Sequence, residues 1–210
     1  GYPTNWAYTL PGSNYVIDSD YAMDTNVVSH QDYSGIVAEA LKAIPTLSVA
    51  MDPHDLFGAY GIYTAQDDDL YGNEIDDNLN ERPASVELVY ADGRKAFGSQ
   101  LVGIKPHSRF ADDPEAPDLK RSLRLGFKKR FGKGKLAYHV FENAPANAET
   151  GAAEYDRLVL RAGSHRNYAG KRQVSQEWTT LTRDQWLRDA QIAMSGDGAR
   201  GTFVHLYLNG

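Results

Sequence analysis

Two basic residues in one short segment, LKRSLRLGF, are the strongest candidates for chemistry in this chain. Leu123, Leu125 and Phe127 alternate with polar residues, which is typical of a strand with one apolar face. Lys120 and Arg124 then share the opposite face, about 13 Å apart at ~3.3 Å per residue. Cations in this arrangement bind phosphate groups when their face lines a cleft. The alternative is a strand whose polar side simply faces water, a common arrangement in antiparallel sheets.

Other patterns for catalysis or metal binding are weak. The six His residues form no HExxH motif, no Gly-x-Ser-x-Gly occurs, and the absence of Cys excludes disulfides, thiolate metal sites and a cysteine nucleophile. In the acidic segment QDDDLYGNEIDDNLNERP, Asp67, Asp69 and Gly72 match positions 1, 3 and 6 of a calcium-binding EF-hand loop. Tyr71 and Asn78 stand at positions 5 and 12, where ligands are required. A solvated acidic surface loop therefore explains this segment better than a calcium site does, and we predict no metal site in the chain.

Composition and charge limit the possible classes of protein. The chain has 210 residues, is 41% hydrophobic and carries a formal net charge of -6. This size supports one medium-sized core, and the negative charge argues against nucleic-acid binding. No apolar run reaches the ~20 residues of a transmembrane helix, so we predict no membrane span in this segment.

The segments around the two cations predict an α+β domain with a mixed, mostly antiparallel sheet and two principal helices. The segments SVELVY and KAFGSQLVGI, joined by ADGR, predict a β-hairpin, and DPHDLFG predicts a turn. Further strands are expected in TLSVAM, LKRSLRLGF, YDRLVLRAG and FVHLYL.

The two helices are predicted from residues that recur with helical periodicity. The first is expected in SHQDYSGIVAEALKAI, with Pro45 ending it. The second is expected over Arg183–Met194, where Thr182 and Gln185 have the spacing of a capping box. We expect this second helix to bury Leu187 and Met194.

The domain organisation is predicted from the two ends of the chain. Residues 1–28 contain Pro and Gly without periodicity, which indicates an extended lead-in or linker from an upstream module. Residues 29–210 would form the folded domain. The chain ends on Asn209-Gly210, a strong signal for a hairpin turn, with no returning strand. We therefore expect the chain to be an internal piece of a longer protein, truncated at its C-terminus.

Several segments, in this order, resemble the bacterial spore-coat-H (CotH) kinase-like family. They are ALKAIPTLSVAMDPHDLFGAYGIY, ERPASVELVYADG, VGIKPHSR, KRSLRLGFKKRFGKGKLAYHVF, YDRLVLRAGS, TRDQWLRDAQIAM and GTFVHLYLNG. The similarity begins near Tyr21 and continues to the last residue. Two departures affect loops: Pro106-His107 replaces a small-residue turn, and the acidic segment replaces a shorter link.

The resemblance implies the N-terminal part of an atypical kinase-like domain that transfers a phosphoryl group from ATP, with Mg²⁺, to a protein hydroxyl. Lys120 matches the family's Lys in the strand motif K-x-S-x-R-L-x-F and is the best candidate for a phosphate contact, followed by Arg124. Arg161 would pair with a carboxylate from the missing half of the domain or order the cleft, or would form an ion pair that only holds two strands together. The metal-binding carboxylates and the base would lie beyond Gly210, so this piece alone would be inactive.

The resemblance also concerns location and partners. It is closest to long bacterial surface proteins in which upstream β-modules precede this domain, which implies an extracellular or cell-surface location. The protein substrate is not identified by the sequence. A non-catalytic surface-binding or scaffold module with a kinase-like fold is the alternative function.

Overall fold

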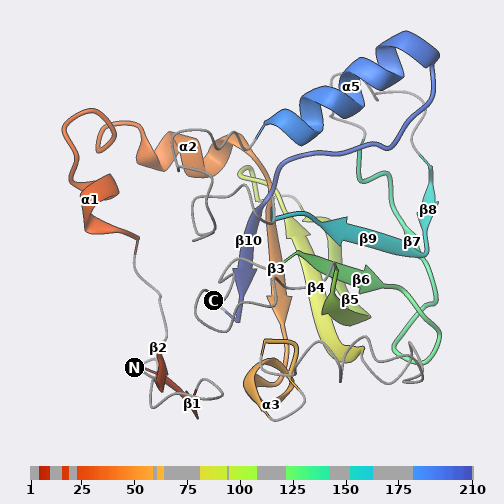
Figure 1. Cartoon of the computed structure of the whole chain (residues 1–210), viewed down its shortest axis with the longest axis horizontal. Coiled ribbons are helices and arrows are strands. Elements are labelled where there is room, and N and C mark those ends of the chain that lie inside the picture. The colour runs from red at the N-terminus through yellow and green to blue at the C-terminus, as the bar shows by residue number, and fades with distance from the viewer. Residues whose placement is uncertain are drawn as a thin grey trace, which may run out of the picture. The chain divides into compact units, whose positions relative to one another are not determined.

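The computed structural model describes residues 5–9, 16–18, 23–58, 61–63, 81–93, 95–107, 122–141, 152–162 and 182–209. These residues form four helices and ten strands (Figure 1). The strands are β1 Asn5–Thr9, β2 Val16–Asp18, β3 Thr46–Ala50, β4 Arg82–Val89, β5 Lys95–Pro106, β6 Leu123–Gly126, β7 Leu136–Ala137, β8 Glu154–Tyr155, β9 Arg157–Leu160 and β10 His205–Leu208. The helices are α1 Thr25–Val28, α2 Val37–Ala43, α3 Pro53–Phe57 and α5 Arg183–Ser195.

The predicted α+β class and its mostly antiparallel sheet are confirmed. The main sheet has the strand order β10-β3-β4-β5-β6-β9. The pairs β3–β4, β5–β6 and β6–β9 are antiparallel, whereas the edge strand β10 is parallel to β3. Two further antiparallel pairs, β1–β2 and β7–β8, form small separate sheets. The predicted hairpin corresponds to β4 and β5, with Gly93 in the connecting turn at a positive φ of 76°.

The chain divides into two compact units. Unit 1 consists of Gly1–Gln66, Arg82–Gln100 and Phe203–Gly210, and unit 2 consists of Asp67–Glu81 and Leu101–Thr202. Each unit has its own buried apolar residues. Those of unit 1 are Leu47, Val49, Leu56, Ile62, Ala84, Val86, Leu88 and Phe97, and those of unit 2 are Val102, Ile104, Leu123, Leu125, Phe127, Leu136, Ala162 and Ile192.

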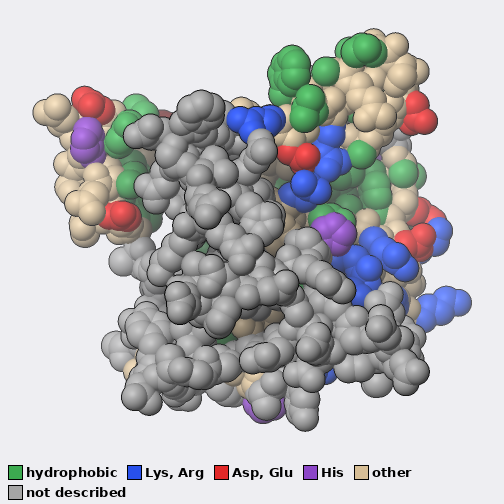
Figure 2. Space-filling model, in the orientation of Figure 1, with side chains coloured by type: hydrophobic (Ala, Val, Ile, Leu, Met, Phe, Trp, Pro, Cys, Tyr) green, Lys and Arg blue, Asp and Glu red, His purple; other side chains and the backbone are tan. Residues whose placement is uncertain are grey.

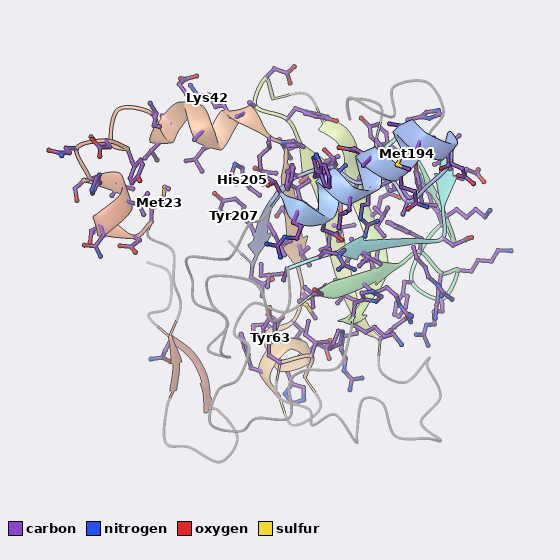
Figure 3. The ribbon with its side chains drawn as sticks, turned by 45° about the horizontal axis from the view of Figure 1, so that its top comes forward. Met23, Lys42, Tyr63, Met194, His205 and Tyr207 are labelled. Carbon is purple, nitrogen blue, oxygen red and sulfur yellow. The ribbon has the colours of Figure 1, made fainter. Side chains whose placement is uncertain are left out.

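In unit 1, Asn209 at the end of β10 forms two side-chain hydrogen bonds with Met51, the residue that follows β3. Its side-chain oxygen accepts a hydrogen bond from the Met51 backbone N–H at 2.8 Å, and its side-chain amide donates to the Met51 carbonyl at 2.9 Å. Its φ of 55° lies in the left-handed region, which Asn tolerates better than most residues. On the same strand, His205 and Tyr207 are labelled in Figure 3. A His205 ring nitrogen lies 3.4 Å from the Ala40 carbonyl oxygen of α2.

Two short segments of unit 1 are helical where the sequence analysis expected none. The predicted turn DPHDLFG contains α3, because Asp52 caps it by accepting from the His54 N–H at 2.8 Å and Pro53 occupies the first turn. The expected extended lead-in contains α1, which Asp24 caps in the same way through Asn26 N–H at 2.8 Å. Both departures follow from Asp at the N-cap of a helix of at most five residues.

The first predicted helix is confirmed as α2 but is shorter than expected. It begins at Val37, ends at Ala43 before Pro45, and has no buried residue. Lys42, labelled in Figure 3, pairs with Glu39 at 3.0 Å on this helix.

In unit 2, the alternation predicted for LKRSLRLGF is confirmed for its described residues. Leu123, Leu125 and Phe127 are buried, and the Arg124 side chain points to the other face of β6. That face is not simply solvated, because the Arg124 side chain is only 15% exposed.

The second predicted helix is confirmed as α5, but its predicted cap and buried residues are wrong. The Thr182 side chain makes no capping hydrogen bond, and Gln185 bonds instead to Asp189 at 2.8 Å. Leu187 is 54% exposed and Met194, labelled in Figure 3, is 88% exposed. Ile192 is the buried residue of α5, so the helix packs by a different face from the one that periodicity suggested.

Thr182→Ala is therefore expected to change the free energy of unfolding by less than about 0.5 kcal/mol, the usual range for a surface substitution. Gly196→Ala is expected to cost about 1 kcal/mol, because Gly196 ends α5 with a φ of 73° that alanine adopts poorly. Chemical denaturation of both variants measures the difference. A loss of 1 kcal/mol or more in Thr182→Ala would restore the capping box.

Candidate functional site

One face of β5, β6 and the residues that follow them gathers four basic or titratable side chains in unit 2. Lys105 on β5 is the registered partner of Arg124 on β6, so their side chains leave the sheet on the same side. His107 lies two residues after Lys105, and the backbone N–H of His107 donates a hydrogen bond to the Ser122 carbonyl oxygen at 2.8 Å. Arg161 lies one residue past the end of β9. We call Lys105, His107, Arg124 and Arg161 the basic face.

The three cations of the basic face act electrostatically on His107. Burial lowers the pKa of His107 below its ordinary value of 6.5, and the charges of Arg124, Arg161 and Lys105 lower it further. The His107 ring is therefore neutral at pH 7. Figure 2 shows Lys and Arg side chains gathered over β6 and β9. Lys105 is 7% exposed, so one of these charges is buried.

At one end of the basic face, Arg161 forms an ion pair with α5. Its Nε lies 2.9 Å from Asp184 Oδ2, and Arg188 Nε lies 3.1 Å from the same oxygen. Asp184 stands in the first turn of α5, where the helix dipole stabilises a negative charge. Both Arg161 and Asp184 are 51% exposed, so the pair contributes little to stability.

At the other end of the basic face, three cationic side chains surround the buried carboxylate of Glu81. Its Oε2 accepts from Arg130 Nη2 at 2.7 Å and from Lys128 Nζ at 3.0 Å, and its Oε1 lies 3.5 Å from Arg124 Nη2. The Glu81 side chain is 1% exposed. Burial alone would raise its pKa, but the hydrogen bonds and charges of Lys128 and Arg130 outweigh burial and lower the pKa below 4.5. Glu81 is therefore ionised at neutral pH.

Of the three site residues predicted from sequence, the structure brings two to the same face. Arg124 and Arg161 both act on His107, and each has a carboxylate within 3.5 Å. Arg161 reaches a carboxylate of α5 within this chain. Lys120 lies outside the described residues, and so does the acidic segment considered for calcium.

Sequence reasoning missed Lys105, His107 and Glu81. Lys105 is a charged residue that directly follows the apolar run LVGI within a strand, and a buried charge of this kind needs a polar partner or ligand. Glu81 was counted with the acidic surface loop, although it directly precedes β4 and is buried. Two glycines within strands, Gly103 and Gly126, could have indicated that another group packs closely against the sheet there, because glycine inside a strand often marks such a close approach.

Within the part of the chain that the structure describes, no three His, Asp or Glu side chains gather to hold a metal ion. No described helix is long and apolar enough to cross a membrane. Comparisons with protein-family models, curated proteins and solved structures found no match.

Proposed function

We propose that unit 2 binds the phosphate groups of a nucleotide, as part of an atypical, spore-coat-H-like kinase domain that transfers a phosphoryl group from ATP to a protein hydroxyl. One observation supports this most directly. Lys105 and Arg124 stand opposite each other in register on one strand face, with Arg161 near the same histidine. Like charges opposite one another in a sheet repel. Both charges would attract a bound polyanion, which supports phosphate groups as the ligand class.

The balance of charge on this side of the sheet supports the same ligand class. Among the residues that the structure describes, Lys105, Arg124, Lys128 and Arg130 supply four positive charges on this side, and Glu81 supplies a negative charge that contacts three of them. The resemblance of KRSLRLGF to the kinase-like family's strand adds Lys120 to this set. Phosphoryl transfer depends mainly on positioning and charge stabilisation, which such cations supply.

When bound, ATP would supply the phosphoryl group and Mg²⁺ would neutralise its charge. Lys105, Arg124 and Lys120 would hold the phosphates, and the neutral His107 ring would add a hydrogen bond. Glu81 does not fit the role of a magnesium ligand, because Lys128 and Arg130 already occupy its carboxylate. We therefore assign no described residue as a magnesium ligand or as the base.

Lys105→Met is expected to weaken ATP binding about tenfold or more, since a hydrogen bond to a charged group contributes about 1.5–3 kcal/mol. Lys120→Ala is expected to have an effect of the same size, and Arg124→Ala a smaller effect on affinity combined with a loss of stability. Calorimetric titration with ATP and Mg²⁺ measures each affinity.

Lys42→Met is the matched control, because it removes the same charge from an exposed position on α2. Equal ATP affinity in wild type, Lys105→Met and Lys120→Ala would remove both lysines from the site. Absence of ATP binding in the wild type would favour the alternative function, a non-catalytic binding or scaffold module. The exposed Trp186 and Met194 of α5 would then be the surface to examine.

A further inference from the structure

The Glu81 carboxylate packs directly against two glycines of the sheet. Gly103 on β5 and Gly126 on β6 are registered partners on the same face as Lys105 and Arg124. A Cβ added at Gly103 would lie 2.8 Å from Glu81 Oε2, and one added at Gly126 would lie 3.1 Å from Oε1. Glu81 thus lies directly over this pair of glycines, two residues along each strand from Lys105 and Arg124.

The contacts of Glu81 divide into two kinds. Lys128 and Arg130 make the short hydrogen bonds, both to Oε2, and Arg130 also stacks over the Phe131 ring at 4.5 Å. The contact with Arg124 uses the other oxygen, Oε1, and is longer at 3.5 Å. The short bonds fix the carboxylate, so Oε1 has a fixed position beside the Arg124 guanidinium.

The carboxylate of Glu81 can determine the direction of the Arg124 side chain, which stands opposite Lys105. Lys105 and Arg124 are registered partners of like charge, so a carboxylate beside Arg124 favours the side-chain direction that brings the guanidinium toward that carboxylate. A guanidinium has N–H donors on three nitrogens in a planar fork, so it can contact Glu81 and a phosphate at the same time. Fixing it in advance lowers the entropy that ligand binding must remove.

We propose that Glu81, which lies over Gly103 and Gly126, is a positioning residue that orients Arg124 for anion binding, while Lys128 and Arg130 neutralise the charge of the Glu81 carboxylate. The effect on phosphate binding rests on the proposed function, whereas the orientation of Arg124 does not. The opposite role is a competitor, in which Glu81 occupies Arg124 in place of the ligand. The two roles predict opposite signs for the same substitution.

The first test is titration with inorganic tripolyphosphate. Glu81→Gln keeps the shape and removes one negative charge from this side of the sheet, so simple electrostatics would strengthen anion binding. A positioning role predicts the reverse, a loss of about fivefold or more, which is the range of a typical coupling between two groups. Glu154→Gln is the charge-matched control, since Glu154 is an exposed residue paired with Lys135. Unchanged or tighter binding in Glu81→Gln would overturn the proposal.

The second test needs no ligand and reads Arg124 directly. In ¹⁵N NMR spectra of arginine side chains, the Arg124 signals are assigned by their loss in Arg124→Lys. We expect separate Nη signals in the wild type, which report slow rotation of a held guanidinium, and a single averaged signal in Glu81→Gln. Identical Arg124 signals in the two proteins would contradict the positioning role whatever the titration shows.

The two tests separate the two proposals. Slow Arg124 rotation that depends on Glu81, in a wild-type protein that binds no tripolyphosphate, would support the positioning role and refute the proposed function. If Glu81→Gln does not fold, Glu81→Asp replaces it, because withdrawing the carboxylate by one methylene removes the contact with Arg124 but keeps the charge.

Discussion

Gly103→Ala is expected to destabilise the protein by about 3 kcal/mol, near the upper end for overpacking a filled site. The new methyl group would lie 2.3 Å from Phe131 Cε2 and 2.8 Å from Glu81 Oε2. Moving Phe131 disturbs the ring on which Arg130 stacks, and moving Glu81 breaks its short hydrogen bonds. The substitution therefore acts on a buried charge cluster as well as on packing.

Gly98→Ala is the matched control on the same strand. A Cβ at Gly98 meets nothing within 4 Å among the described residues, and glycine within a strand costs about 0.5–1 kcal/mol relative to alanine. Gly98→Ala is thus expected to leave stability unchanged or to raise it slightly. Urea denaturation of both variants provides the comparison. Equal stabilities would show that Glu81 and Phe131 move aside without cost.

The sequence predicted those parts of the fold that depend on local patterns. β3 follows from a short run of apolar and β-branched residues, and β6 from strict alternation that leaves Arg124 opposite the buried leucines. The hairpin β4–β5 follows from two such runs around a turn with Gly93. These features need no information from distant residues.

The parts that sequence reasoning missed depend on contacts between distant segments. The three cations around Glu81 come from positions more than 40 residues later in the chain, so no local pattern reveals that its charge is neutralised. The predicted cap at Thr182 is wrong because Gln185 finds Asp189 as a partner instead. The buried face of α5 is set by what packs against Ile192, which periodicity alone does not determine.

Glu81 also makes the stability of the protein depend on pH. Its folded-state pKa lies below 4.5, so the unfolded chain binds more protons at this carboxyl group than the folded chain does. The contribution of Glu81 is then fully present above pH 4.5 and is lost as the pH falls through the folded-state pKa. His107, whose pKa is also lowered, acts in a separate window that begins near pH 6.5.

Glu81→Gln is expected to lower the free energy of unfolding at pH 7 by about 3 kcal/mol, the lower end for breaking a buried ion pair. The lower end applies because Lys128 and Arg130 are 28% and 37% exposed and regain water when the carboxylate is lost. The difference between wild type and variant should shrink below pH 4.5, where the wild-type carboxyl group also becomes neutral. Denaturation curves from pH 3 to pH 8 measure it.

His107→Gln separates the two windows in the same experiment. It should flatten the change in stability that begins near pH 6.5 and leave the loss below pH 4.5 in place. Glu81→Gln should do the opposite. A difference between wild type and Glu81→Gln that stays constant from pH 8 down to pH 3 would mean that Glu81 has the same pKa in the folded and the unfolded chain, and the charge cluster around it would then be wrongly assigned.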